Sequence, residues 1–207
     1  MAIASLNING LRGHHDEIKL LLNDQGIHIL DLNETKLDAS MPKELTEIPG
    51  YQQKRLDRTC NGGGVALYVR DSIKMTPRDD VPSEGLELLC VETSPPKSKP
   101  FLVVAWYRPP SDLVDSFNKL EKALAFLDKE GKEIILLGDT NCDLAKKSTD
   151  QTLDNNAKHI SSLYELFSFK QLIEEPTRVT LDTATVIDHV ATTCPRNIMK
   201  SGVHEVP

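Results

Sequence analysis

The chain has 207 residues, of which 39% are apolar and 27% charged, as is ordinary for a folded protein with one large core. Its net charge of −7 argues against broad electrostatic binding of nucleic acid, and no apolar run approaches the roughly 18 residues of a membrane span. The four cysteines are widely separated and the start does not resemble a signal peptide, so we expect an intracellular monomer without a disulfide framework, zinc site or membrane segment.

Apolar periodicity and turn residues divide the chain into strands and helices. In chain order the predicted elements are a strand over residues 4–8, a helix over 16–26, strands over 27–32, 65–69, 86–92 and 101–107, a helix over 116–129, a strand over 132–135 whose apolar run continues to Gly138, a helix over 155–167 and a strand over 186–193. Residues 9–15 are expected to form a loop, with Asp16 or a neighbour capping the first helix. Several strands follow one another without intervening helices, which favours mainly antiparallel sheet with outer helices in a single domain, residues 1–207.

The run Gly138-Asp139-Thr140-Asn141 comes at the end of a buried apolar strand. Side chains two residues apart on a strand share a face, so Asp139 and Asn141 are expected to point the same way. A carboxylate and a carboxamide placed like this suit the holding of a water and a phosphate oxygen near a divalent cation. The same run also fits an ordinary turn, and these residues alone leave both interpretations open.

Other polar residues lie at or near the ends of predicted strands. Asn7 and Asn9 flank Ile8 at the end of the first strand and are expected to share a face. Glu34 stands at the end of the second strand, Tyr107 ends a later one, and Asp188 lies in the last strand. A carboxylate such as Glu34 suits Mg²⁺, which takes one or two carboxylates together with waters and substrate phosphate. Each has an ordinary alternative, since asparagines cap turns, lone glutamates are mostly exposed, and a tyrosine can anchor a proline bend. A buried acid such as Asp188 needs a partner.

Seven motifs, taken together and in this order, resemble the endonuclease/exonuclease/phosphatase superfamily. They are most similar to the endonuclease domains of non-LTR retrotransposons, more than to the apurinic/apyrimidinic endonucleases or the lipid phosphatases. The motifs are Leu-Asn-Ile-Asn-Gly-Leu-Arg at 6–12, Asn-Glu-Thr-Lys at 33–36, Gly-Gly-Gly-Val-Ala at 62–66, Tyr-Arg-Pro-Pro at 107–110, Gly-Asp-Thr-Asn at 138–141, Pro-Thr-Arg at 176–178 and Ile-Asp-His at 187–189.

The resemblance implies an α/β fold, a four-layer sandwich of two mainly antiparallel β-sheets flanked by helices. It also implies metal-dependent hydrolysis of a phosphodiester, here the nicking of DNA. Glu34 would be the main ligand of Mg²⁺, with Mn²⁺ as a substitute, and Asn7 would lie beside the ion as a second ligand and catalytic residue. The ion would act as Lewis acid and clamp.

The catalytic roles implied by the resemblance fall on four further residues. Asp139 would orient or deprotonate the attacking water, and Asn141 would hold the phosphate. Tyr107 would stabilise charge on the phosphoryl oxygens, and Asp188 would orient a histidine that acts on the scissile phosphate.

DNA is the implied partner in spite of the acidic net charge. Arg12, Lys36, Arg55 and Arg108 follow predicted strand ends and are the expected phosphate contacts; Arg58 and Arg70 are further basic candidates, and each also fits ordinary surface charge. The retrotransposon resemblance further implies a nuclear location and a reverse transcriptase domain in a parent polyprotein.

The chain departs from the superfamily pattern at its end. That pattern closes with a Ser-Asp-His motif on a final strand, which is due where residues 201–207 stand, so we expect a truncated final strand and weakened activity. His189 follows Asp188 in a strand and should face the opposite side, and His204 comes too early. Two other interpretations remain: a catalytically silent, domesticated remnant that binds nucleic acid or a protein, and a small-molecule or phospholipid phosphodiesterase.

Overall fold

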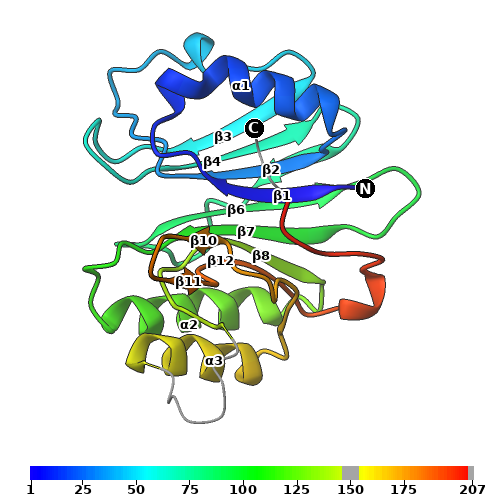
Figure 1. Cartoon of the computed structure of the whole chain (residues 1–207). Coiled ribbons are helices and arrows are strands. Elements are labelled where there is room, and N and C mark those ends of the chain that lie inside the picture. Colours follow the sequence, from blue (N-terminus) through cyan, green and yellow to red (C-terminus); the bar gives the residue numbers. More distant parts are fainter. Residues whose placement is uncertain (146–153, 205–207) are drawn as a thin grey trace.

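Two β-sheets pack face to face between outer helices, which gives four layers in the computed structural model (Figure 1). The structure describes residues 1–145 and 154–204. Helix α1 (Leu11–Asp24) covers one sheet, while α2 (Asp115–Asp128) and α3 (Asn155–Leu166) cover the other. The predicted four-layer α/β sandwich is therefore confirmed. Within the described residues, no helix combines the length and the apolar character that crossing a membrane requires.

The first sheet has four strands. Their order is β1 (Ile3–Asn7), β2 (Ile29–Asn33), β4 (Val65–Arg70) and β3 (Tyr51–Leu56). The β1–β2 pair is parallel and the other pairs are antiparallel. Strand β4 shows why both faces are apolar: Val65, Leu67 and Val69 face the second sheet, whereas Ala66 and Tyr68 pack in the cluster beneath α1.

The second sheet has six strands. Their order is β5 (Lys74–Pro77), β6 (Glu87–Ser94), β7 (Phe101–Tyr107), β8 (Ile134–Asp139), β12 (Asp188–Thr192) and β9 (Lys170–Gln171). Only the β7–β8 pair is parallel among these described strands. Every residue of β7 is buried, because one face meets the first sheet and the other meets α2.

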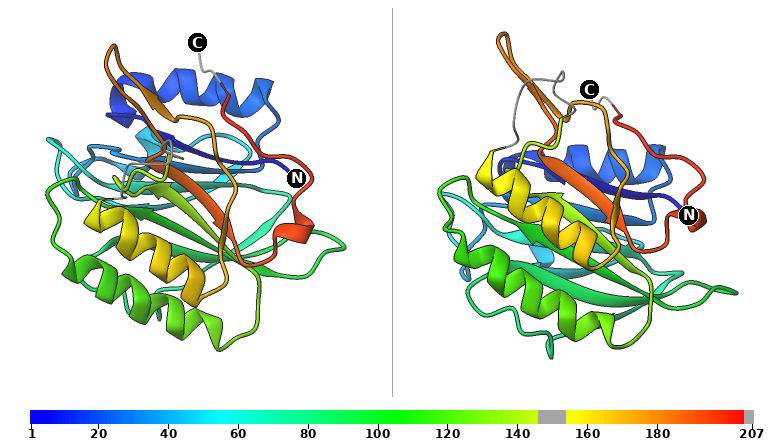
Figure 2. Two further views of the ribbon diagram at one scale, coloured as in Figure 1. Left: turned by 60° about the horizontal axis from the view of Figure 1, so that its bottom comes forward. Right: turned by 90° about the horizontal axis from the view of Figure 1, so that it is seen from below.

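Short elements complete the described chain. The strands β10 (Arg178–Val179) and β11 (Ala184–Thr185) form a hairpin that projects away from the sheets (Figure 2). The 3₁₀ turns η1 (Lys43–Leu45) and η2 (Pro195–Asn197) lie after β2 and after β12 respectively. Figure 2 also shows α2 and α3 side by side on the second sheet.

The predicted loop over residues 9–15 is wrong, because helix α1 already begins at Leu11. The sequence carries no side-chain cap there: Gly10 is the N-cap residue and makes no side-chain bond. Tertiary contacts start the helix instead, since the backbone N–H groups of Gly10 and Leu11 donate to the carbonyls of Glu34 and Thr35 at 2.8 and 2.9 Å. Asp16, the expected cap, pairs with Lys19 within the helix.

Candidate active site

The candidate site lies where the ends of strands from both sheets meet. Asn7 ends β1 and Asp139 ends β8, so the two residues belong to different sheets. The amide nitrogen Nδ2 of Asn7 donates to Glu34 Oε1 and to Asp139 Oδ2, each at 2.9 Å. Asp188 begins β12 directly opposite Asp139 in the antiparallel register. The structure thus brings together residues that lie up to 181 positions apart in the chain (188 − 7).

Backbone strain is concentrated at this site. Among the described residues, six that are not glycine have a positive φ, and four of them are Asn9 (50°), Glu34 (53°), Lys36 (52°) and Asn141 (49°). A left-handed conformation at such residues costs on the order of 1–3 kcal/mol each and persists only where the surrounding structure holds it. This clustering makes the region around Glu34 and Asn141 the candidate functional site.

The argument that placed Asp139 and Asn141 on one strand face is wrong. Strand β8 ends at Asp139, and the left-handed Asn141 lies in the turn that follows. The Asn141 backbone N–H donates to Asp139 Oδ1 at 3.0 Å, and its side-chain Nδ2 donates to the Arg108 carbonyl at 2.9 Å. A turn with an Asx hydrogen bond therefore brings the two residues together.

Sequence reasoning missed a buried polar chain behind Asp139. Asn33 Oδ1 accepts the Asp139 backbone N–H at 2.6 Å, while Asn33 Nδ2 donates to Asp31 Oδ2 at 2.8 Å. Ser5 Oγ donates to the same Asp31 oxygen at 2.6 Å, and Asp31 Oδ1 is buried without a hydrogen-bond partner among the described residues. An acid within the apolar stretch 27–32 was the signal that could have revealed it.

Burial raises the pKa values of the acids in this region. The pKa of Asp139 rises to about 6, chiefly through burial and then through the charge of Asp188. The pKa of Asp31 rises to about 7, and that of Asp188 is also raised, again with burial as the largest cause. Burial and then Glu34 hold the pKa of the Tyr107 hydroxyl well above its usual range, so Tyr107 stays a proton donor at neutral pH.

These acids fit a divalent cation that needs few protein ligands. Among residues 1–145 and 154–204, no three His, Cys, Asp or Glu side chains form a closed metal cage. Mg²⁺ usually binds through only one or two carboxylates, together with waters and substrate phosphate. Here the Glu34 and Asp139 carboxylates both accept hydrogen bonds from the Asn7 amide nitrogen. Asn7 itself faces both acids with its nitrogen, since its Oδ1 accepts the Asn9 N–H at 3.1 Å. To serve as a ligand, the Asn7 amide would have to rotate.

The histidines take no part in this arrangement. His189 is fully buried on the other side of β12, where Nδ1 pairs with the Tyr164 hydroxyl at 2.9 Å, and burial lowers its pKa to about 4. His204 is exposed. Asp188 Oδ1 is buried and has no hydrogen-bond partner within the described part of the chain.

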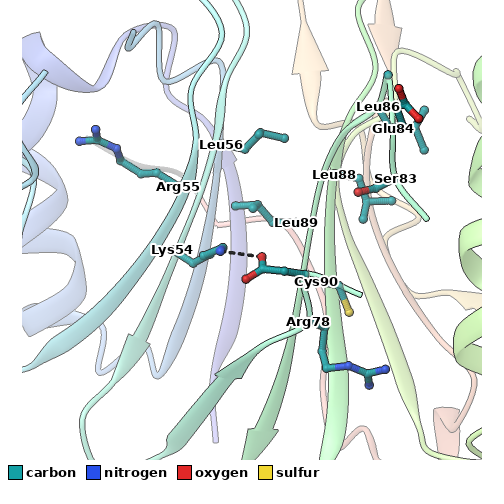
Figure 3. Close-up of a pocket in the computed structure, with 12 residues that line it drawn as sticks. Lys54, Arg55, Leu56, Arg78, Ser83, Glu84, Leu86, Leu88, Leu89 and Cys90 are labelled. Atoms are coloured by element: carbon teal, nitrogen blue, oxygen red, sulfur yellow. Dashed lines mark hydrogen bonds and ion pairs between the residues drawn. The ribbon is translucent and has the colours of Figure 1, made fainter. Parts of the chain in front are cut away.

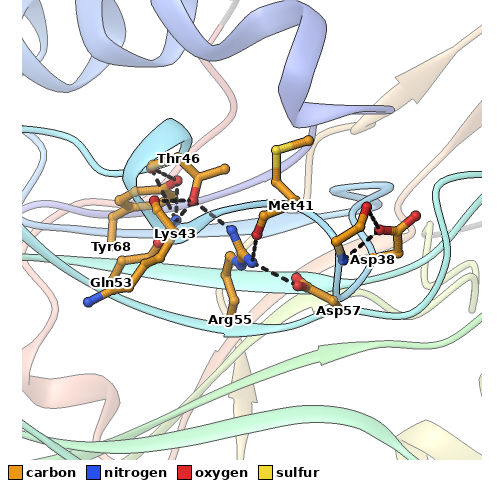
Figure 4. A network of polar contacts seen from close by, with 9 residues as sticks. Asp38, Met41, Lys43, Thr46, Gln53, Arg55, Asp57 and Tyr68 are labelled. Atoms are coloured by element: carbon orange, nitrogen blue, oxygen red, sulfur yellow. Dashed lines mark hydrogen bonds and ion pairs between the residues drawn. The ribbon is translucent and has the colours of Figure 1, made fainter.

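Two of the four predicted DNA contacts are withdrawn. Arg55 donates to Thr46 Oγ1, the Met41 carbonyl and Asp57 at 2.8–2.9 Å, so three of its five guanidinium N–H groups are bonded within the protein (Figure 4). Arg108 is 1% exposed, and its guanidinium carbon lies 4.7 Å from the centre of the Phe117 ring. Either guanidinium would have to give up these internal contacts to bind a phosphate.

Other basic residues have different surroundings. Arg12 is exposed on the first turn of α1. Lys36 lies beside the site, with Nζ 4.0 Å from Glu34 Oε2 and hydrogen-bonded to Asn9 Oδ1. The two remaining candidates contact the protein itself, as Arg58 pairs with Glu87 and Arg70 donates to Tyr51. Arg12 and Lys36 therefore remain the predicted phosphate contacts.

The two stacked sheets and their outer helices define the class of protein as a four-layer α/β sandwich with an acidic strand-end site. Residues 4–194 match the model of the Endonuclease/Exonuclease/phosphatase family. The chain belongs to this family, as its motifs predicted. A comparison with curated proteins gives no match.

Solved structures share this fold at low sequence identity. The catalytic domain of Xenopus laevis APE2 superposes with a TM-score of 0.70 at 17% identity, covering 93% of this chain and 82% of that one. The 3′-5′ exonuclease NExo from Neisseria meningitidis gives 0.71 at 18% identity, covering 93% and 87%. The endonuclease domain of TRAS1, a telomere-specific non-LTR retrotransposon, gives 0.69 at 12% identity, covering 91% and 83%.

Proposed function

We propose that this protein is a Mg²⁺- or Mn²⁺-dependent phosphodiesterase that nicks DNA. The observation that carries the proposal is the contact of one Asn7 amide with Glu34 and with Asp139, which brings two acids from the two sheets to one place. Family membership supports hydrolysis of phosphate esters in general. An acidic pair without a closed cage fits a cation that shares its coordination with substrate phosphate.

The residues have distinct roles in the proposed reaction. Glu34 and Asp139 would hold the metal ion, which would supply positive charge to the phosphate when bound. Asp139 accepts the proton of the attacking water as the water oxygen bonds to phosphorus and the bond to the leaving oxygen breaks. The Tyr107 hydroxyl, protonated at neutral pH, donates to a phosphoryl oxygen, and the Asn141 amide holds another.

The choice of DNA rests on the motifs and on the relatives. One structural neighbour, NExo from Neisseria, is described as a 3′ phosphatase bound to a product DNA hairpin. The triple-glycine and Tyr-Arg-Pro-Pro motifs favour a retrotransposon origin, with a nuclear location and a reverse transcriptase as part of the same polyprotein. Residues 1–207 contain no Ser-Asp-His run, so we propose that nicking by this chain is slow.

One observation favours a second candidate, a catalytically silent domain that binds nucleic acid or a protein. Asp188 should orient a histidine, yet its buried Oδ1 has no partner among the described residues and His189 faces the other way. This candidate predicts DNA binding without cleavage.

The test is the conversion of supercoiled plasmid to the nicked circle in Mg²⁺, with Asp139→Asn beside the wild type. A matched control is Glu92→Gln, which alters a carboxylate that pairs with Lys132 far from the site. The proposal expects slow nicking by the wild type and the control, and none by Asp139→Asn. Binding without any nicking supports the silent domain, and nicking that survives Asp139→Asn contradicts the mechanism.

A further inference from the structure

Glu87 joins the two sheets close to the candidate site. It is the first residue of β6 in the second sheet, where it is register-paired with Tyr107 on β7. Its carboxylate reaches the first sheet: Oε1 accepts from Arg58 Nη1 and Oε2 accepts the backbone N–H of Gly64, both at 2.5 Å. The Glu87 side chain is 15% exposed, so this contact is largely shielded from solvent.

The glycines at 62–64 allow the close approach of this carboxylate. Arg58 Nε also donates to the Gly62 carbonyl at 2.8 Å, so the guanidinium spans the segment. A Cβ atom at Gly63 would lie 2.2 Å from Arg58 Nε and 2.5 Å from Glu87 Oε2. Gly63 and Gly64 also have φ angles of 72° and 88°. Only glycine fits here, and we call Glu87, Arg58 and residues 62–64 the glycine clamp.

The glycine clamp binds the backbone that carries Glu34. The N–H of Lys36 donates to the Gly63 carbonyl at 2.9 Å, and the N–H of Thr35 donates to the Gly64 carbonyl at 3.2 Å. Glu34 and Lys36 are both left-handed, a conformation that the surrounding structure has to hold. Glu87 thus fixes the glycine segment, and the glycine segment fixes the backbone of Thr35 and Lys36, directly after Glu34.

We propose that Glu87, acting through Arg58 and residues 62–64, is a positioning residue that holds Glu34 in the geometry needed to bind a divalent cation. This inference rests on the proposed function for the metal, while its effect on the backbone is independent of the metal. Groups that orient metal ligands without touching the ion typically change metal affinity by about 10- to 100-fold when removed.

The chain offers a matched control for the loss of Glu87. Lys54 on β3, labelled in Figure 3, forms an ion pair at 2.7 Å with Asp79, which follows β5, so this pair also joins the two sheets. It borders a cavity of about 350 Å³ whose lining includes neither Glu34 nor residues 62–64. Removing Asp79 breaks a contact between the sheets without touching the glycine clamp.

The experiment compares Glu87→Ala and Asp79→Ala in the full 207-residue chain. Amide hydrogen exchange of Thr35 and Lys36 is measured without metal, and Mn²⁺ affinity is measured by water proton relaxation. We expect Glu87→Ala to accelerate exchange at these two amides relative to the core strands and to weaken Mn²⁺ binding at least tenfold. Asp79→Ala should leave both readouts at the wild-type level. Glu87→Gln, which keeps an acceptor for the Gly64 N–H, should recover part of the affinity.

Arg58→Ala is a second variant in case Glu87→Ala does not fold, because the Arg58 side chain is 40% exposed and its loss is better tolerated. It should change both readouts in the same direction by a smaller factor. Wild-type exchange and Mn²⁺ affinity in Glu87→Ala, or in Arg58→Ala if only that variant folds, would overturn the inference and leave the proposed function intact. A wild type that binds no Mn²⁺ would contradict the proposed function. The exchange data would still decide whether the glycine clamp holds the backbone of residues 34–36.

Discussion

At the scale of single residues, the polar side chains of the site form hydrogen bonds within the protein instead of being solvated. Asn7 donates to Glu34 and Asp139, and Asn33 accepts from the Asp139 backbone. Asp31 is fully buried and receives two hydrogen bonds on one oxygen, while its other oxygen has no partner among the residues that the structure describes. A buried carboxyl with an unpaired oxygen is less stable in its ionised form, which makes stability depend on pH.

Asp31 should make the metal-free protein less stable as pH rises. Its pKa is about 7 in the folded state, raised mainly by burial, against about 3.9 in an unfolded chain. The folded state holds this proton more tightly, so the stability is fully present below pH 4 and is lost as pH rises through 7, by a few kcal/mol in order of magnitude. Asp31→Asn should therefore be more stable relative to wild type at pH 8 than at pH 4. Thermal unfolding in EDTA measures this, and an equal difference at both pH values would contradict the account.

Arg12 and Lys36 should contribute to DNA binding through phosphate contacts. Each replacement by Ala should weaken binding to a short duplex and lower the slope of log K against log salt by about one unit. Arg55→Ala is the matched control, because that guanidinium bonds to Thr46, Met41 and Asp57 and should affect stability alone. An unchanged salt slope in an Arg12→Ala and Lys36→Ala double variant would show that DNA is not held through this face.

At the scale of elements, the sequence predicted those whose apolar pattern is strong. Strand β7 (Phe101–Tyr107) was predicted at its observed bounds, and α2 and α3 within a residue or two, because their inward faces are continuously apolar. Strand β3 was missed because its centre is the polar run Gln-Gln-Lys-Arg at 52–55, and β5 because it is short and exposed. The pairing of β3 with β4 is a tertiary contact that no local pattern contains.

The candidate site could be predicted in part for the same reason. Glu34 and Asp139 belong to recognisable motifs at strand ends, although their roles remain predictions. The contacts of Asn141 with Arg108, of Asn33 with Asp139, of Asp31 with Ser5 and of Arg55 with Met41 join segments that are separated in the chain. Side-chain spacing within one element cannot reveal such contacts.

Strands β7 and β8 approach so closely at Gly138 that no side chain fits there. A Cβ at this position, where φ is 138°, would lie 2.1 Å from the Trp106 carbonyl oxygen. Gly138→Ala should destabilise the protein by about 3 kcal/mol or more, through overpacking and backbone strain together. Gly26→Ala is the control, since φ is 59° there and no heavy atom of the described residues lies within 4 Å of the added Cβ; it should cost about 1 kcal/mol. Urea unfolding distinguishes them, and equal losses would contradict this interpretation.

At the scale of the whole molecule, the site exists only because two sheets are held together at one end. The first sheet supplies Asn7 and Glu34, and the second supplies Tyr107, Asp139 and Asp188. Contacts between the sheets, such as the Asn7 bridge and the glycine clamp, are therefore part of the site as well as of the fold. Loss of packing between the sheets should remove metal binding before the helices unfold.

A calorimetric titration with Mn²⁺ tests the central claim most directly, that Glu34 and Asp139 form a metal site across the two sheets. Wild type, Glu34→Gln and the control Glu92→Gln are compared under identical conditions. We predict one weak site in the wild type and in Glu92→Gln, and its loss in Glu34→Gln. The Asp139 carboxylate and the Asn7 amide cannot replace Glu34 as the main oxygen ligand. Binding of Mn²⁺ by Glu34→Gln with wild-type affinity would contradict the assignment of the site.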